Sequence, residues 1–391
     1  MPLSYSKATI VANALLEAVA ATTLFFRMRR LNRPSGGEPR LPRRILFVEP
    51  FGMGDVLSLS VTFDALRSAF PGAEIWLLTK CGNEALYEAD SRVARTFVAP
   101  IPWSRLPGKK RGRIRDWIAV ARTCREIAAL EPDVGLDTRG EIRSQLLMVL
   151  CGCRRRIGFA NYLNTNLNVR GRLLSTVVEK PWALHRYAMN RLLVREGLGI
   201  DVPEKMPSFR PEIPAARPEG AENAPVLLHV GARWSFRRWP EERWADLVRR
   251  LKEAGRSPCV VGSPAEEESV RRIARAGGCV AEIADMRRLI GLVKGCCALI
   301  CLDSGPMHVA QTLGRPVVAL FGPGDFELWH PTGPLDRSVF HRLSCNPCRQ
   351  HECVRPGDPC MLRIEAEEVF ERATEALERA GSAAWGRDGN G

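Results

Sequence analysis

The sequence predicts an α/β protein with two doubly wound, Rossmann-like domains, each built on a parallel sheet. Three observations carry this prediction. Short continuous apolar runs alternate with helical stretches, which is typical of βαβ units whose sheet is covered on both faces. A proline-rich segment divides this alternation into two series. The 391 residues are enough for about two domains, each with its own core.

The first series occupies residues 43–205. Its apolar runs are short and lack charges in their interior, so we expect strands that are buried on both faces. The stretches between them have the length of helices. The strands are predicted at 44–48, 74–79 and 133–137, and the helices at 55–70 and 114–130.

The segment 202–225 contains six prolines and few large apolar residues, so residues 206–224 are predicted to be a linker. A second series fills residues 225–391 and ends with a cysteine cluster and a terminal helix. Two such domains would leave a ligand cleft between the carboxyl ends of their sheets. The strands of this series are predicted at 225–230, 259–261, 280–283, 298–302 and 316–321, and the helices at 241–255, 265–276, 286–294 and 307–313.

The net charge of +13 favours an anionic partner, and the basic residues cluster in 1–44, 105–125 and 151–172. Residues 1–42 stand apart because the mostly apolar stretch Ala8–Phe26 runs directly into Arg27, Arg29 and Arg30. It contains Glu17 and three threonines. An interfacial helix with a basic anchor therefore fits better than a membrane span. A helix packed on the first domain is an equally open alternative.

Most of the thirteen cysteines sit singly in apolar runs and are predicted to be reduced, buried thiols. Four others fall within sixteen residues, with His351 among them. Such a group can bind structural zinc or another thiophilic metal, form disulfides or stay as free thiols, and we place metal narrowly first. Its spacing is not that of a standard zinc ribbon. The four are Cys345, Cys348, Cys353 and Cys360.

Asp55 is the first candidate for chemistry. The first predicted strand ends in Glu49–Asp55, where Gly52 and Gly54 allow a tight turn that a ligand can approach closely. An aspartate that opens a helix is usually an N-cap. A carboxylate held rigidly at the mouth of a cleft is also well placed to act as a general base.

A phosphate site is predicted where Asp303, Ser304 and Gly305 follow a strand and open a helix. Backbone N–H groups at a helix N-terminus have affinity for phosphate, and His308 in the first turn would donate to the same oxygens. A second loop after a strand carries Arg237 and Arg238, whose guanidinium groups suit a diphosphate.

Together these residues resemble glycosyltransferase family 9, the bacterial ADP-heptose:lipopolysaccharide heptosyltransferases. The resemblance covers about residues 43–375, and its motifs occur in the family's order. They are Gly54-Asp55, Phe70-Pro-Gly-Ala73, Leu136-Asp-Thr-Arg-Gly140, Arg156-Ile-Gly-Phe159, His229-Val-Gly-Ala232, Arg237-Arg-Trp-Pro240, Gly262-Ser-Pro-Ala-Glu266 and Asp303-Ser-Gly-Pro-Met-His308.

The resemblance implies a GT-B fold and a metal-independent reaction that inverts the anomeric centre, with an ADP-sugar as donor and no required cofactor. Asp55 would be the base on the acceptor hydroxyl. Arg237 stands where the family usually has lysine, so it would stabilise the leaving diphosphate, unless Arg238 has taken over that role. The remaining donor-binding residues would be Asp303 at the sugar, Ser304, Gly305 and His308 at the diphosphate, Glu266 at the ribose and Gly231 beside them.

The function expected on these grounds is transfer of a heptose, or a related sugar, to a lipopolysaccharide core or other lipid-linked saccharide acceptor. The enzyme would work in the bacterial cytoplasm, peripheral at the inner face of the membrane. Another GT-B nucleotide-sugar enzyme, with a different donor or an epimerase activity, is the first alternative. A basic nucleic-acid-binding protein is the second, but few aromatic residues accompany the basic runs, so we expect no nucleic-acid partner.

Overall fold

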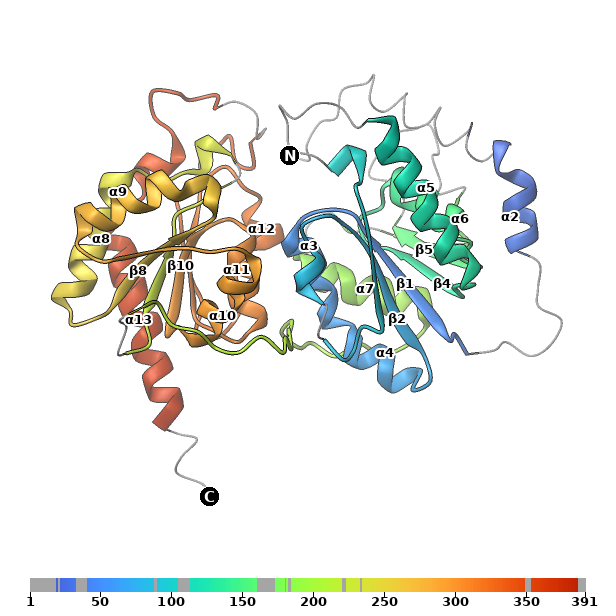
Figure 1. Cartoon of the computed structure of the whole chain (residues 1–391), viewed down its shortest axis with the longest axis horizontal. Coiled ribbons are helices and arrows are strands. Elements are labelled where there is room, and N and C mark those ends of the chain that lie inside the picture. The colour runs from blue at the N-terminus through green and yellow to red at the C-terminus, as the bar shows by residue number, and fades with distance from the viewer. Residues whose placement is uncertain are drawn as a thin grey trace. The chain divides into compact units, whose positions relative to one another are not determined.

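The computed structural model describes residues 19, 22–32, 41–87, 90–104, 113–159, 173–179, 181, 184–219, 223–232, 234–348 and 353–385 (Figure 1). The chain divides between Lys205 and Met206 into two compact units. Within the described residues, each unit contains one six-stranded sheet, and all of its neighbouring strands run parallel. The predicted α/β class with two doubly wound sheets is confirmed.

The sheet of the N-terminal unit has the strand order β3-β2-β1-β4-β5-β6. Helices α5 and α6 cover one face, where Leu46 and Val48 of β1 join their core, and α4 packs Phe63 on Phe47 from the other face (Figure 1). The strands are β1 (Arg44–Glu49), β2 (Glu74–Lys80), β3 (Arg95–Ala99), β4 (Val134–Asp137), β5 (Arg155–Phe159) and β6 (Thr176–Val178). The helices are α2 (Phe25–Leu31), α3 (Met53–Leu57), α4 (Phe63–Ala69), α5 (Ile114–Ala129), α6 (Ile142–Leu150) and α7 (Arg186–Leu198).

The helix predicted at 55–70 is broken into three pieces. A 3₁₀ turn, Ser58–Val61, separates α3 from α4. The hydroxyls of Ser58, Ser60 and Thr62 each donate to the carbonyl three residues earlier, at 2.6–2.8 Å. Such bonds compete with the regular helical pattern and favour a tighter turn. Asp55 is not the N-cap residue that an aspartate at a helix start usually is, because Gly52 holds that position and Asp55 is the third helical residue.

Helix α2 is packed on the N-terminal unit. Met28 is buried in a small apolar cluster with Ile142 and Val149 of α6. The Arg27 guanidinium donates to the carbonyls of Val149 and Leu150 at 3.0 and 2.8 Å. Most of the predicted apolar stretch before α2 lies outside the described residues. Within the described ranges, no helix has both the length and the apolar character needed to cross a bilayer.

The sheet of the C-terminal unit has the order β12-β11-β10-β7-β8-β9. Helices α8, α9 and α13 share one core with the strands, while α10 and α11 pack together elsewhere on the unit (Figure 1). The strands are β7 (Val226–His229), β8 (Pro258–Gly262), β9 (Val280–Ile283), β10 (Ala298–Leu302), β11 (Val317–Phe321) and β12 (Arg337–Phe340). The helices are α8 (Glu241–Glu253), α9 (Glu267–Gly277), α10 (Met286–Gly295), α11 (Gly305–Thr312), α12 (Phe326–Trp329) and α13 (Ala366–Trp385).

Residues 206–219 of the predicted linker form no helix or strand, but they are fastened to the C-terminal unit. The Phe209 amide donates to the Thr312 carbonyl at 2.8 Å, and the Ala216 amide donates to the Gly291 carbonyl at 2.8 Å. The Lys294 ammonium donates to the carbonyls of two further residues in the segment. This segment therefore belongs structurally to the unit that follows it.

Candidate active-site residues in the two units

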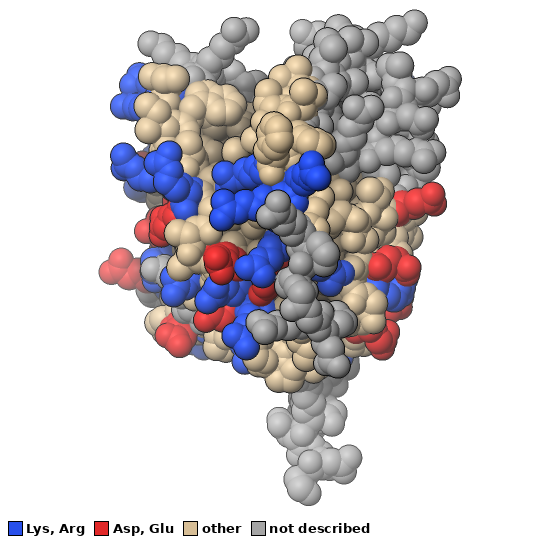
Figure 2. Space-filling view, turned by 90° about the vertical axis from the view of Figure 1, so that its right-hand side faces the viewer, with Lys and Arg blue, Asp and Glu red and all other residues tan. Residues whose placement is uncertain are grey.

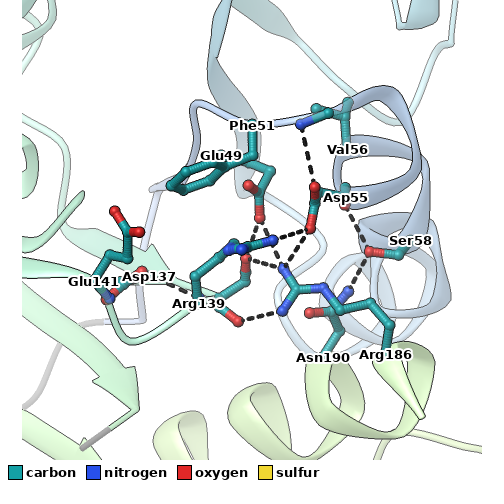
Figure 3. Close-up of polar contacts among 12 residues, drawn as sticks. Glu49, Phe51, Asp55, Val56, Ser58, Asp137, Arg139, Glu141, Arg186 and Asn190 are labelled. Atoms are coloured by element: carbon teal, nitrogen blue, oxygen red, sulfur yellow. Dashed lines mark hydrogen bonds and ion pairs between the residues drawn. The ribbon is translucent and has the colours of Figure 1, made fainter. Parts of the chain in front are cut away.

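In the N-terminal unit, polar side chains gather where the central strands end. Glu49 is the last residue of β1, and Thr138 and Arg139 follow β4 directly. Asp55 comes from α3 and Arg186 from the first position of α7 (Figure 3). Because parallel strands present their carboxyl ends at one edge of the sheet, residues distant in sequence meet there.

Asp55 is held as an ionised carboxylate. Its Oδ1 lies 2.6 Å from Arg139 Nη1 and 3.7 Å from Arg186 Nη2, and its Oδ2 accepts the Gly52 amide at 3.1 Å (Figure 3). Burial alone would raise the pKa of Asp55, but the two guanidinium groups and the Gly52 amide outweigh it and lower the pKa below its ordinary value. The predicted base is therefore deprotonated, which is the form that a general base needs before it reacts.

Glu49 is a second carboxylate beside Asp55, and it is fully buried. Its Oε2 accepts hydrogen bonds from Arg186 Nη2 at 2.9 Å and from the Thr138 hydroxyl. Its Oε1 has no hydrogen-bond partner within the described part of the chain. Burial and the charge of Asp55 raise the pKa of Glu49 to about 7, although Arg186 and Arg139 oppose them.

The two arginines near Asp55 are held differently. The Arg186 side chain is 3% exposed and also donates to the Thr138 carbonyl at 2.7 Å. The Arg139 side chain is 31% exposed and lies over the ring of Phe51, with 4.3 Å between the guanidinium carbon and the ring centroid. One guanidinium is thus fixed in the interior, and the other lies at the surface of the same cluster.

Asp137 shapes the turn that carries Arg139. Its carboxylate accepts the amides of Arg139 and Glu141 at 3.1 and 3.0 Å, and the side-chain amide of Gln145 at 3.2 Å. Burial raises the pKa of Asp137 to about 6, although these hydrogen bonds act to lower it. The carboxylate therefore replaces missing backbone partners where the chain leaves β4 for α6.

Glu49, Arg139 and Arg186 were not identified as site residues from the sequence. Glu49 directly follows the predicted strand 44–48, which is a signal for the ligand-binding edge of the sheet, and Arg139 lies within one of the family motifs. Nothing near Arg186 in the sequence marks it, because its partners come from β1, α3 and the turn after β4.

In the C-terminal unit, the structure brings Arg237 and Asp303 together. Arg237 Nη1 lies 2.9 Å from Asp303 Oδ2 and donates to the Asp303 carbonyl at 3.1 Å. Gly324 packs against this pair so closely that a Cβ there would collide with the Asp303 carboxylate. Burial raises the pKa of Asp303, Arg237 opposes this shift and Asp325 adds to it. Arg238, by contrast, is exposed.

The predicted phosphate-binding segment begins α11. Ser304 is the N-cap residue and Gly305 the first helical residue. The Ser304 hydroxyl donates to the Leu302 carbonyl at 3.1 Å and makes no capping hydrogen bond to the helix. His308 is buried in α11, with its ring centroid 5.1 Å from that of Trp329. The amides of the first turn are therefore not capped by the Ser304 side chain, which suits an anionic ligand.

Glu266 and Gly231 meet at the ends of β7 and β8. The Glu266 carboxylate accepts the amide and hydroxyl of Ser263 at 2.8 and 2.7 Å. A Cβ at Gly231 would collide with this carboxylate. Burial lowers the pKa of the neighbouring His229, and Glu266 opposes that shift. Glycine at 231 is thus required for the close approach of the β7 loop to Glu266.

The four clustered cysteines line a single pocket, together with residues such as Phe236 and Pro323. All four are free thiols. Across the described ranges, no three side chains among His, Cys, Asp and Glu are arranged to hold a metal ion. A structural zinc ion at Cys345, Cys348, Cys353 and Cys360 stays a prediction.

Comparison with known proteins gives a consistent result. A family model described as glycosyltransferase family 9 (heptosyltransferase) matches residues 120–357. Lipopolysaccharide heptosyltransferase 1 of Pseudomonas aeruginosa is 27% identical over 323 residues, which are 80% of this chain and 87% of that protein. Lipopolysaccharide heptosyltransferase 2 of Escherichia coli K12 is 23% identical over 357 residues, covering 85% of this chain and 98% of that protein.

Solved structures share the fold. The E. coli heptosyltransferase WaaC with ADP-2-deoxy-2-fluoro heptose superposes with a TM-score of 0.68 at 19% identity, over 85% of this chain and 99% of that chain. The E. coli ADP-heptose lipopolysaccharide heptosyltransferase II gives a TM-score of 0.64 at 19% identity, over 86% of this chain and 99% of that chain. The GT-B fold implied by the motifs is confirmed.

Proposed function

The chain belongs to glycosyltransferase family 9, and from this premise we propose that it transfers a heptose, or a related sugar, from an ADP-sugar to a lipid-linked saccharide acceptor. It is a glycosyltransferase related to the heptosyltransferases of the lipopolysaccharide core. The observation that supports the proposed sugar transfer is the state of Asp55. It is a buried carboxylate kept ionised by two guanidinium groups at the end of a parallel sheet.

In the proposed reaction, Asp55 takes the proton of the acceptor hydroxyl. The acceptor oxygen attacks the anomeric carbon from the side opposite the diphosphate. The bond between that carbon and the diphosphate oxygen breaks, and ADP leaves with the electron pair. The anomeric centre is inverted, the proton stays on Asp55 until solvent removes it, and no metal or cofactor is required.

Residues of the C-terminal unit would bind the donor. Arg237 is held by Asp303 and would direct its guanidinium at the diphosphate, where charge develops as ADP leaves. The first turn of α11, with Ser304, Gly305 and His308, would bind the same group. Glu266, packed on Gly231, would accept the ribose hydroxyls. The E. coli heptosyltransferase WaaC, which shares the fold, has been solved with ADP-2-deoxy-2-fluoro heptose, and this supports an ADP-sugar as the class of donor.

We expect Arg237→Ala and His308→Ala each to weaken ADP binding by about tenfold or more, because hydrogen bonds to charged groups are worth about 1.5–3 kcal/mol. Calorimetric titration with ADP and ADP-heptose measures this, with UDP-glucose as the competing donor class. Arg271→Ala, at an exposed position of α9, is the matched control. Unchanged ADP affinity in both variants would move the donor site elsewhere. Turnover of a UDP-sugar without acceptor would indicate an epimerase instead.

We also propose that the enzyme contacts the inner face of the cytoplasmic membrane through α2. Phe25 and Phe26 on this helix are 51% and 80% exposed, and Arg29 and Arg30 beside them are exposed as well. Figure 2 shows Lys and Arg side chains gathered on the side of the molecule where Figure 1 places α2. Exposed aromatic rings with flanking arginines suit reversible binding to an anionic lipid surface.

The full-length protein is therefore expected to sediment with vesicles that contain phosphatidylglycerol, and high salt should release much of it. Each basic residue near such a surface contributes about 1 kcal/mol, so the double variant Arg29→Gln/Arg30→Gln should bind at least about tenfold more weakly. Phe26→Ser should weaken binding further without disturbing buried Met28. Equal sedimentation of all three proteins would refute the role of α2, and salt-resistant pelleting would indicate a deeper insertion.

A further inference from the structure

Two guanidinium groups lie beside the Asp55 carboxylate, those of Arg139 and Arg186. The one in closer contact, Arg139, is the less deeply buried of the two. Arg139 makes the shorter ion pair, at 2.6 Å, yet its side chain is 31% exposed. Arg186 stands 3.7 Å from the same oxygen and is held by Glu49 and by the carbonyl and hydroxyl of Thr138. Figure 3 shows both arginines converging on Asp55 from different elements.

This arrangement conflicts with what a general base must do. A carboxylate in a close ion pair is a weaker base, because the cation stabilises its charged form. Asp55 Oδ2 already accepts the Gly52 amide, and Oδ1 accepts Arg139 Nη1. Departure of Arg139 would free Oδ1 and make Asp55 more basic, while Arg186 would still neutralise part of its charge.

Arg139 is the arginine that a bound acceptor can reach. The guanidinium of Arg139 also packs over the ring of Phe51, and this contact does not depend on which anion is paired with Arg139. Among the described residues, the acidic groups that act on its charge are Asp55, Glu49 and Glu141. Glu141 is already paired with Arg143 at 2.7 Å, and Glu49 with Arg186 at 2.9 Å. An incoming anion would thus compete chiefly for the contact with Asp55.

We propose that Arg139 recognises an anionic group of the acceptor, leaving Asp55 for that group when the acceptor binds and so exposing the base. The proposal rests on the assignment of Asp55 as the base. Arg139 exchanges one ion pair for another and so stays paired, while Asp55 keeps only Arg186 and the Gly52 amide as partners among the contacts described above. The acceptor class is then a saccharide with a carboxylate or phosphate near the reactive hydroxyl, and a neutral saccharide would leave the base covered.

The test uses Arg139→Met, which keeps an apolar side chain over Phe51 and removes the charge, with Arg139→Lys as the conservative variant. Heptose-free lipopolysaccharide is the acceptor and ADP-heptose the donor. We expect the acceptor KM to rise at least about tenfold in Arg139→Met and less in Arg139→Lys. The donor KM should not change. Circular dichroism and thermal unfolding of both variants establish that they are folded.

The pH profile separates recognition from a merely structural ion pair. The acid limb of kcat/KM for the acceptor reports the free enzyme, and that of kcat reports the bound complex. Loss of Arg139 removes a cation beside Asp55 and Glu49, so the kcat/KM limb should move to higher pH. The kcat limb should stay in place, because Arg139 has already left Asp55 in the complex.

Equal shifts of both limbs, or an unchanged acceptor KM, would overturn the proposal. Two further acceptors then identify the anion, one lacking the lipid A phosphates and one lacking the sugar carboxylates. Arg139→Met should no longer change the KM for the acceptor that lacks the group bound by Arg139. If Asp55→Asn keeps normal turnover, the proposed base itself fails. If Asp55→Asn is inactive and Arg139→Met behaves like the wild type, only the present inference fails.

Discussion

Asp55→Asn is expected to lower kcat by about 10²–10⁴-fold while leaving the affinity for ADP unchanged. General-base catalysis contributes about this factor, and an amide cannot accept the acceptor's proton. The substitution preserves shape, and the amide oxygen can still accept the Gly52 amide that Asp55 binds at 3.1 Å. The loss should therefore appear in the chemical step. Single-turnover transfer from ADP-heptose measures it, and calorimetry with ADP tests the donor site.

Asp116→Asn is a matched control within the same unit. Asp116 occupies the same position in α5 as Asp55 does in α3, and its carboxylate accepts the Arg113 amide at 2.8 Å. If the role of Asp55 is only to cap a helix, the two variants should show the same small change in stability and near-normal kcat. A large loss of kcat confined to Asp55→Asn would establish that this carboxylate does more than cap.

The parts of the candidate site that could be predicted from the sequence are those with a local signal. Asp303, Ser304 and His308 lie in one short motif at a strand end, and Asp55 and Arg237 lie in two others. A strand followed by a turn and a helix places such residues at the ligand-binding edge of a parallel sheet. Their neighbourhood was therefore predictable without knowledge of the packing.

The parts that were missed depend on long-range contacts. Arg186 meets Glu49 because α7 packs where β1 and β4 end side by side, and no local pattern contains that information. The break of the helix predicted at 55–70 has a local cause, because three hydroxyl residues stand at alternate positions there. How strongly their hydrogen bonds compete with the regular helix depends on the burial of these side chains. The periodicity of a single sequence reflects the spacing of apolar residues. It contains no information on the meeting of Arg186 with Glu49 or on the burial of the three hydroxyl residues.

Glu49 should make the stability of the N-terminal unit depend on pH. Its pKa is raised from 4.5 to about 7 in the fold, so the folded chain binds this proton more tightly than the unfolded chain. The stabilisation is fully present below about pH 4.5 and is lost as the pH rises through 7. Between pH 5 and pH 8 the free energy of unfolding should fall by about 2–3 kcal/mol through this group.

Glu49→Gln should remove that part of the pH dependence, because a neutral amide has no proton to lose when the pH rises. Arg186 would keep the carbonyl and hydroxyl of Thr138 as acceptors, at 2.7 and 2.9 Å, so the variant should still fold. Urea unfolding at several pH values measures the difference, with Glu196→Gln at an exposed position of α7 as control. Parallel curves for the wild type and Glu49→Gln would mean that Glu49 is already ionised in the fold at low pH, held by Arg186 and the Thr138 hydroxyl. A slope that disappears only in Glu49→Gln would identify this buried carboxylate as the group that binds the proton beside the base.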